Sequence, residues 1–255
     1  MDDNALQDSR AIIVTGGGRG IGAATARLAA AQGWRVAVNY REDHRSAKRV
    51  VDAIRAAGGT AIAVQADVSD EAQVLAMFER VDAELGLLGG LVNSAGVVDR
   101  ALPLAEQGVA RWRRMFDINA IGTLLCAREA VRRMSTLRGG AGGSIVNVSS
   151  GAARLGSPNE YVDYAASKGA IDTLTIGLAK EVAGEGIRVN AVRPGLIETD
   201  IHASGGRPER VALLAPQVPI GRGGSAEEVA EAIAWLLSDK ASYTTMALID
   251  VTGGR

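Results

Sequence analysis

The sequence has little of several residue types, and each shortage excludes a class of protein. It contains one cysteine, Cys126, so no intrachain disulfide can form and a disulfide-stabilised secreted protein is excluded. Lys and Arg number 28 and Asp and Glu 29, so a net charge of −1 gives no field to attract nucleic acid or an anionic membrane. No 18 apolar residues run without a charge, and the first ten residues lack the apolar core of a signal peptide. We expect a cytoplasmic protein that binds neither nucleic acid nor membrane.

What the sequence does have is a globular composition with an excess of glycine. Apolar residues make up 47% and charged residues 22%, and a chain of 255 residues can bury a large core. Glycine occurs 32 times, which indicates many tight turns and close backbone contacts. No linker divides the chain, so we expect one domain over residues 10–255 after a flexible tail at residues 1–9.

Short apolar runs rich in β-branched residues alternate with helical stretches. Several runs are apolar at every position, as strands buried on both faces are, and the helices between them supply the crossovers of a parallel sheet. We predict a Rossmann-like, doubly wound α/β fold with helices on both faces of a seven-stranded parallel sheet. The predicted strands are residues 11–15, 34–39, 60–66, 90–93, 144–148, 187–192 and 248–251.

The segment at residues 195–219 interrupts this pattern after a predicted strand. It contains Gly205-Gly206 and three prolines, and it is long for a connection inside a compact domain. This favours a lid over a binding crevice, with a disordered surface loop as the alternative.

The first predicted strand leads into the glycine turn Thr15-Gly-Gly-Gly-Arg-Gly-Ile-Gly22 and then into a helix. Glycines let the backbone approach a pyrophosphate, and the helix dipole and free amides at a helix start favour its charge. A lysine followed by serine or threonine is absent from the turn, which argues against a P-loop. Tight packing without a ligand is the alternative interpretation. The predicted cofactor-binding residues of this turn are Gly16, Gly18, Arg19, Gly20, Ile21 and Gly22.

The end of the second predicted strand bears on cofactor choice. It reads Asn39-Tyr40-Arg41, with no carboxylate for a free ribose 2′-hydroxyl. Arg41, together with Arg19 in the glycine turn, could instead pair with a 2′-phosphate. We therefore predict that NADP(H) is favoured over NAD(H), with contacts from Asn39, Tyr40 and Arg41. The alternative is that both arginines are ordinary surface charges.

Tyr164 and Lys168 stand four residues apart in a helical stretch, so they share one helix face. An ammonium beside a phenol favours the phenolate, so we predict a lowered pKa for Tyr164 and a role as general acid and base. Ser149, Ser150 and Asn93 end predicted strands, where an open α/β sheet forms its crevice, and Asn119 opens a helix. Taken singly, each of these residues could equally be a turn former or a helix cap.

Together, these motifs resemble the short-chain dehydrogenase/reductase family, from about Arg10 to Gly254. The matching residues are Thr15-Gly16-x-x-x-Gly20-x-Gly22, Asp67-Val68, Asn93-Ser-Ala-Gly96, Asn119, Ser150, Tyr164-x-x-x-Lys168, and Pro194-Gly195 with Thr199. The resemblance implies a catalytic tetrad in which Tyr164 exchanges a proton with the substrate oxygen and Ser150 hydrogen-bonds that oxygen. Lys168 would bind the nicotinamide ribose and Asn119 would hold a water in a proton relay.

The resemblance also implies the remaining cofactor contacts and the assembly. Asp67 and Val68 would flank the adenine, while Asn93, Ala95 and Gly96 would support the cofactor. Carboxamide binding would fall to Pro194, Gly195, Ile197 and Thr199. Tyr164 and Lys168 would contact the nicotinamide half, no metal would take part, and the protein would be a homotetramer.

Three positions depart from the family pattern. Ser94 replaces the usual second asparagine of its turn. Ser150 precedes Tyr164 by fourteen residues where thirteen is commoner, which leaves Ser149 as an alternative. Met246 stands where a glycine is usual, and a positive φ there would cost stability or shift the turn.

The expected function is hydride transfer between NADP(H) and a carbonyl or secondary alcohol, with a small molecule as substrate. A sugar or polyol dehydrogenase and a 3-oxoacyl-thioester reductase are alternatives within the same chemistry. The alternative of another class is a protein that binds NADP(H) as a sensor without turnover, against which the complete Asn119, Ser150, Tyr164 and Lys168 set argues.

Overall fold

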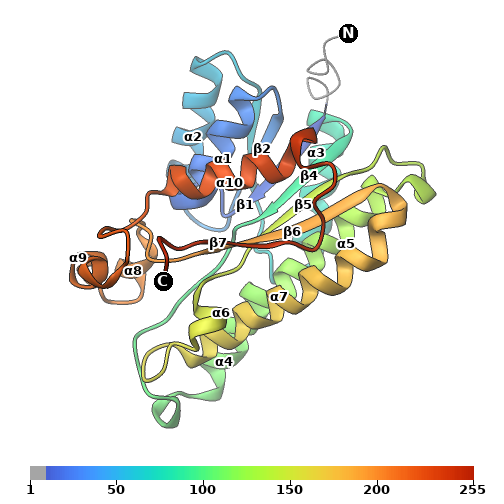
Figure 1. Ribbon diagram of the computed structural model, residues 1–255. Helices are drawn as coiled ribbons and strands as arrows, with labels where there is room; N and C mark the ends of the chain where they lie inside the picture. The colour runs from blue at the N-terminus through green and yellow to red at the C-terminus, as the bar shows by residue number, and fades with distance from the viewer. Residues whose placement is uncertain (1–9) are drawn as a thin grey trace.

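The computed structural model describes residues 10–255, apart from the side chains of residues 202 and 204. The expected tail at residues 1–9 lies outside the described residues. A seven-stranded sheet runs through the molecule in the order β3-β2-β1-β4-β5-β6-β7, and every pairing is parallel (Figure 1). The strands are β1 (Ala11–Thr15), β2 (Arg35–Tyr40), β3 (Ala61–Gln65), β4 (Leu88–Asn93), β5 (Gly143–Val148), β6 (Ile187–Pro194) and β7 (Leu248–Val251). The predicted fold class is confirmed.

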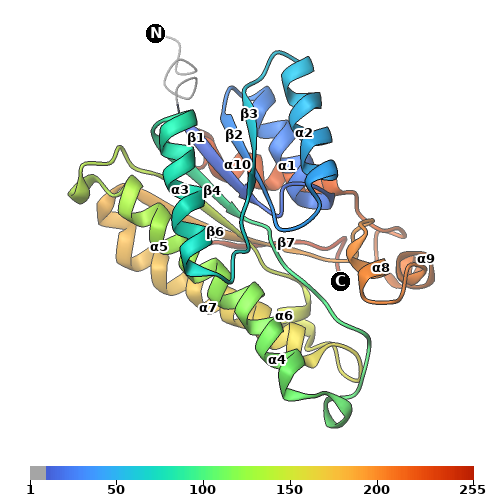
Figure 2. The same cartoon turned by 180° about the vertical axis from the view of Figure 1, so that it is seen from behind.

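Helices cover both faces of the sheet, as Figures 1 and 2 show from opposite sides. One face carries α1 (Gly20–Ala31), α2 (His44–Ala56) and α10 (Ala226–Leu237). The other carries α3 (Glu71–Leu85), α5 (Gly122–Met134) and α7 (Val162–Val182). The shorter helices are α4 (Val109–Phe116), α6 (Ala152–Leu155), α8 (Ile201–Ser204) and α9 (Arg210–Leu214).

The continuous apolar character of the strands has a direct structural cause. In β1, Ala11 and Ile13 pack into the core on the α3, α5 and α7 side, whereas Ile12 and Val14 pack on the α1, α2 and α10 side. All four residues have no exposed surface. Successive side chains point to opposite faces, so a central strand covered twice must be apolar throughout.

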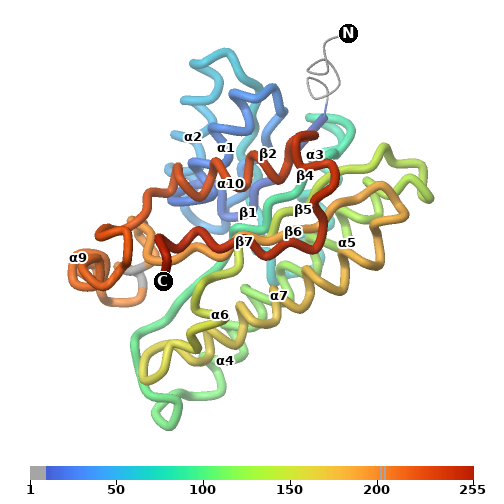
Figure 3. Tube along the Cα trace, in the orientation of Figure 1, coloured from blue at the N-terminus to red at the C-terminus, as the bar shows by residue number. Residues whose placement is uncertain are grey.

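The strand order places a crevice at the carboxyl end of the sheet. The chain returns to pair β4 with β1 on the side opposite β2, so the loops after β1 and β4 diverge and leave a gap between them. The trace in Figure 3 brings the C-terminus back to this end of the sheet, beside α9. The predicted lid region contains α8 and α9, so it is a partly helical segment rather than a structureless loop. Within residues 10–255, no helix has both the length and the apolar character that crossing a bilayer requires.

Met246 has a backbone conformation that costs stability. Its φ is +67°, and its amide donates to the Val189 carbonyl at 2.7 Å, which holds the turn before β7 in place. A side chain beyond glycine in the left-handed region costs roughly 1–2 kcal/mol. From the sequence we expected a loss of stability or a shifted turn if Met246 had a positive φ, and the structure shows that it does.

We expect Met246→Gly to raise the free energy of unfolding by about 1 kcal/mol, because the strain goes and part of the gain is offset by the freer unfolded chain. For a domain of this size, that corresponds to roughly 2–4 °C in Tm. Met246→Ala keeps the β-carbon and serves as the control. A Tm rise of equal size in both variants, measured by calorimetry, would show that the methionine side chain and not the backbone is responsible.

Candidate active site

The glycine turn after β1 is built so that side chains cannot fill it. Gly16 and Gly20 have φ values of +62° and +50°. A β-carbon on Gly22 would lie 2.4 Å from the Gly16 carbonyl oxygen, and one on Gly16 would lie 2.9 Å from Ala95 Cα. Helix α1 begins at this turn, and among the described residues no side chain caps its first amides. Free amides and a positive helix end together suit a phosphate group.

Asn39 is part of the support of this turn. Its Oδ1 accepts from the Gly16 amide at 3.2 Å, and its Nδ2 donates to the carbonyls of Val64 at 3.3 Å and Ala66 at 3.0 Å. The side chain lies at the wall of the cavity but is buried, and its amide ties β2 to β3 and to the glycine turn. The Asn39 amide therefore holds the glycine turn in its shape, and it does not present a free group to a ribose.

The other predicted residues of the adenosine end line the same cavity. Arg19 and Arg41 are exposed at its rim, and Arg41 pairs with Glu42 at 2.8 Å. Tyr40, Asp67 and Val68 also line it, although the Asp67 carboxylate already accepts from the Ser69 hydroxyl at 2.6 Å. Asp43, which sequence analysis did not select, lies beside them. Its pKa is lowered, chiefly by the hydrogen bond from the Ser46 side chain.

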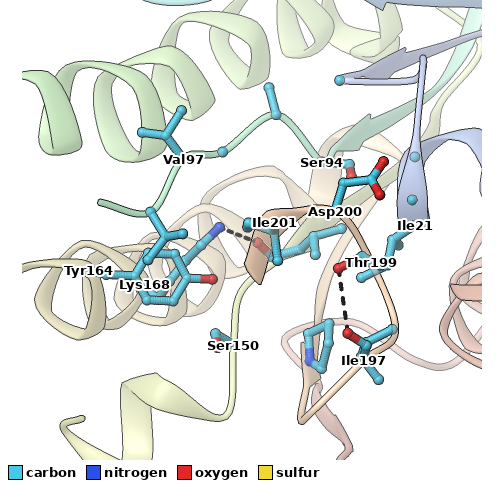
Figure 4. Close-up of a pocket in the computed structure, with 18 of the residues that line it drawn as sticks. Ile21, Ser94, Val97, Ser150, Tyr164, Lys168, Ile197, Thr199, Asp200 and Ile201 are labelled. Atoms are coloured by element: carbon cyan, nitrogen blue, oxygen red, sulfur yellow. Dashed lines mark hydrogen bonds between the residues drawn. The ribbon is translucent and has the colours of Figure 1, made fainter. Parts of the chain in front are cut away.

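At the other end of the cavity, Ser150, Tyr164 and Lys168 come together from two elements (Figure 4). Ser150 follows β5, and Tyr164 and Lys168 lie in the first two turns of α7. The Lys168 ammonium lies 5.8 Å from the centre of the Tyr164 ring and donates to the Val148 carbonyl at 2.7 Å. Ser149 is buried and donates to the Lys168 carbonyl, so Ser150 rather than Ser149 faces Tyr164.

The predicted lowering of the tyrosine pKa is wrong for this structure. Burial raises the pKa of Tyr164 above its ordinary value, and the hydrogen bond with Ser150 opposes this only in part. Burial also lowers the pKa of Lys168 to about 8, with the charge of Asp172 acting the other way. Helical spacing alone gave the two groups as neighbours but not the desolvation that both of them undergo.

Asn119 lies behind the cavity rather than in its wall. It stands in a π-helical turn, Asp117–Ile121, between α4 and α5, and is fully buried. Its Oδ1 accepts from the Val97 amide at 2.8 Å, and its Nδ2 donates to the Val97 carbonyl and to Ser167 Oγ, each at 3.0 Å. Local π-helix often marks a functional position. Here it turns Asn119 toward the cavity-lining segment that follows β4, and the relay water stays a prediction.

Asn93 is likewise a supporting residue. It is buried at the end of β4, outside the cavity wall, and donates to Asn147 Oδ1 at 2.9 Å. Ala95 and Gly96, two and three residues further on, do line the cavity. A β-carbon on Gly96 would lie 3.5 Å from Lys168 Nζ, so the glycine keeps the space beside the lysine open.

The segment after β6 closes the cavity from the remaining side. Pro194, Gly195, Ile197 and Thr199 line it, and Figure 4 shows Thr199 and Asp200 beside Ile21 of α1. A β-carbon on Gly20 would lie 3.2 Å from Thr199 Cγ2, so the start of the lid lies directly on the glycine turn. Together, these segments enclose a cavity of about 820 Å³.

Several cavity residues near Tyr164 were not predicted. They come from α6, from the loop before α7, from the lid and from the chain end, and they are Leu155, Glu160, Tyr161, Ile201, Leu214 and Arg255. Tyr161, three residues before Tyr164 and so near it on one face, could have been found from helical spacing. The others reach the site through loops, which carry no periodic signal.

Comparisons with known proteins point to one family of oxidoreductases. A family model described as enoyl-(acyl carrier protein) reductase matches residues 16–255. The chain is 56% identical over 243 residues to the uncharacterized oxidoreductase YgfF of Escherichia coli strain K12, covering 95% of this chain and 98% of that protein. It is 45% identical to the cis-4-hydroxycyclohexanecarboxylate dehydrogenase of Sinomonas cyclohexanicum, with 96% of each covered. A crystal structure of a dehydrogenase/reductase from Sinorhizobium meliloti 1021 superposes with a TM-score of 0.88 at 32% identity, covering 98% of each chain.

Proposed function

Because the chain belongs to the short-chain dehydrogenase/reductase family, we propose that it is an NADP(H)-dependent enzyme interconverting a ketone and a secondary alcohol, with Tyr164 as the general acid and base. That it is an oxidoreductase using a nicotinamide cofactor follows from the family itself. The observation that carries the finer proposal is the arrangement of one cavity. Ser150, Tyr164 and Lys168 stand at one end, and the side-chain-free glycine turn stands at the other.

The shape of the cavity and the residues that line it suit a dinucleotide. The glycine turn excludes β-carbons where a pyrophosphate would approach, and the first residues of α1 line the same cavity. Gly96 leaves room beside Lys168 for the nicotinamide ribose. When bound, the cofactor supplies the hydride that the carbonyl carbon receives.

Side chains of the protein itself donate the proton and orient the substrate oxygen. Burial keeps the Tyr164 phenol protonated at pH 7, so it can donate to the oxygen of a carbonyl as the carbon is reduced. Ser150 is placed to hydrogen-bond that same oxygen, which orients the carbonyl and stabilises its developing charge. With a pKa of about 8, Lys168 is mostly an ammonium at pH 7 and favours the phenolate left after the proton transfer.

Two substrate classes receive support. The Sinomonas relative is named for oxidation of a ring hydroxyl, and Leu155, Tyr161 and Leu214 give the Tyr164 end an apolar wall suited to a carbocyclic body. A Staphylococcus aureus relative, 37% identical over 249 residues, is named a 3-oxoacyl-[acyl-carrier-protein] reductase, which supports a 3-oxoacyl thioester as the second candidate. A sugar or polyol needs several hydrogen-bonding partners, which Glu160 and Arg210 could supply, but neither named relative of known substrate acts on this class. A sensor without turnover would not need the proton-donating set.

We expect NADPH oxidation with at least one member of a panel containing 4-oxocyclohexanecarboxylate, unsubstituted cyclohexanone, a 3-oxoacyl thioester and an aldose. kcat/KM should be higher with NADPH than with NADH, because Arg19 and Arg41 stand at the rim and β2 itself ends in Asn39 and Tyr40 without a carboxylate.

Arg41→Ala should reduce the ratio of kcat/KM for NADPH over NADH by about tenfold, as loss of one charge-assisted contact implies. Arg27→Ala is the matched control, since Arg27 is an exposed arginine of α1 outside the cavity wall. A native preference for NADH would contradict the assignment of NADP(H). Absence of turnover across the panel with either cofactor would contradict the proposed activity.

The expected homotetramer stays a prediction, with two features in its support. Phe116 of α4, Ile121 of the π-helical turn and Leu124 of α5 are each more than a third exposed. Strand β7 is the last strand of the sheet and leaves one edge unpaired among the described residues. Exposed apolar groups and open sheet edges are commonly covered by assembly.

A further inference from the structure

The α9 part of the lid has little burial of its own to hold it in place. No residue of α9, all five of which the structure describes, is buried, and Leu213 is 60% exposed. Gly206 has a φ of +77° and precedes Arg207-Pro208, so the connection between α8 and α9 is a turn. Segments with few buried apolar contacts open at low free-energy cost. Specific contacts must therefore account for the position of α9.

The loop before α7 provides a fixed point opposite the lid. Ser157 and Asn159 have φ values of +44° and +61°, so this loop keeps a strained conformation, as loops at functional sites do. The Glu160 amide donates to the Ser157 carbonyl at 3.3 Å, and the Glu160 carbonyl accepts from the Leu102 amide at 3.0 Å. The backbone of Glu160 is thus tied to two segments outside the lid, and its side chain is directed from a fixed base.

Glu160 binds both arginines of the lid. Its Oε2 lies 2.7 Å from Arg210 NH2, and its Oε1 accepts from Arg207 NH1. The Arg210 guanidinium also lies over the Tyr161 ring, 5.2 Å from its centre. The Arg210 side chain is only 14% exposed and that of Glu160 29%, so water screens this pair less than an ordinary surface pair. These hydrogen bonds, led by the one from Arg210, hold the pKa of Glu160 below its ordinary value.

This cluster spans the part of the cavity where the substrate would lie. Glu160, Tyr161 and Arg210 line the same cavity as Tyr164, and Tyr161 is the N-cap residue of the helix in which Tyr164 is the third residue. We propose that Glu160 is a positioning residue that holds the lid closed over the substrate through Arg207 and Arg210. It thereby sets the affinity for the carbonyl compound, not the rate of the chemical step. This inference rests on the proposed function, because it assigns the substrate to the Tyr164 end.

Lid closure can be tested without any substrate. Trypsin can cleave after Arg210, and the bond lies in the segment that Glu160 holds, whereas the bond after Arg207 precedes proline and resists trypsin. Glu160→Gln should accelerate cleavage after Arg210 at least about fivefold, detected by fragment mass. Glu84→Gln is the matched control, because Glu84 forms a 2.6 Å pair with Arg80 on α3 outside the cavity wall. Added salt should accelerate cleavage of the native chain and of Glu84→Gln, but not of Glu160→Gln.

A second experiment measures the kinetics of the same variant with the best carbonyl compound of the panel at saturating NADPH. Glu160→Gln should raise its KM about tenfold with kcat within about threefold of native, and Glu160→Asp, which keeps the charge, should recover part of the KM. Native cleavage and KM in Glu160→Gln would overturn the proposal. So would a fall in Tm with accelerated cleavage throughout the chain, because that identifies a merely structural residue. If the native protein turns over no compound, the proposed function fails while the proteolysis still decides whether Glu160 holds the lid.

Discussion

Tyr164→Phe is expected to lower kcat for carbonyl reduction by about 10³-fold while leaving the Kd for NADPH within about threefold of native. Removing a positioned general acid typically costs 10²–10⁴-fold. The ring remains to fill the cavity wall, so the cofactor half of the site keeps its shape. The measurement is initial-rate kinetics with the best panel substrate, together with a fluorescence titration of NADPH.

The pH dependence of the native enzyme should follow the same group. Because burial raises the pKa of Tyr164, the phenol stays protonated through neutral pH and carbonyl reduction should be nearly constant there. Alcohol oxidation needs the phenolate, so its rate should still be rising above pH 8. Tyr243→Phe is the control, since Tyr243 is fully exposed. Turnover of Tyr164→Phe at a native rate would reject the assignment of the proton donor.

Lys168→Met is expected to stabilise the protein without cofactor while lowering kcat at least about 10²-fold. The lysine is buried with a pKa of about 8, against about 10.4 in an unfolded chain. At pH 7, holding its ammonium in the fold therefore costs about 3 kcal/mol, at 1.36 kcal/mol for each pKa unit. Lys168→Met also loses the hydrogen bond to the Val148 carbonyl, which destabilises the variant by roughly 1 kcal/mol. The net expectation is a stabilisation of about 2 kcal/mol.

The sign of the pH dependence separates this origin from better packing. Between pH 8 and 10.4, the unfolded chain binds one more proton at Lys168 than the folded chain, so native stability rises with pH in this window. Lys168→Met lacks that rise, and its advantage in urea denaturation should shrink from pH 7 to pH 10. An advantage independent of pH would mean that desolvation of the ammonium is not its cause. Lys48→Met, at an exposed lysine of α2, is the control.

The sequence could predict the fold because the signals involved are local and repeated. Runs such as 11–15 are apolar at every position because the sheet is covered on both faces, and all seven predicted strands are present with small shifts at their ends. The glycine turn could also be predicted, since a positive φ at Gly16 and Gly20 and the lack of space at Gly22 disfavour other residues there. Helical spacing also placed Tyr164 and Lys168 on one face of α7.

Local sequence signals could not predict properties that arise from burial or from contacts between distant segments. Asn39 and Asn119 were predicted at the site, but their amides bind the backbone of Gly16 and Val97, respectively. Tyr164 was expected to have a lowered pKa, and burial raises it instead. Glu160 drew no attention because its partners lie 47 and 50 residues away in the lid.

The residue order by itself determined which segments are strands, where the backbone must turn through glycine, and which two side chains share a helix face. Each of these depends on neighbours within a few positions along the chain. Only the tertiary structure decided the direction of the pKa shifts of Tyr164 and Lys168, the supporting place of Asn119, and the ion pairs of Glu160 with Arg207 and Arg210. Desolvation and ion pairing depend on what surrounds a group in space, and the surroundings come from segments that the chain brings together only when it folds.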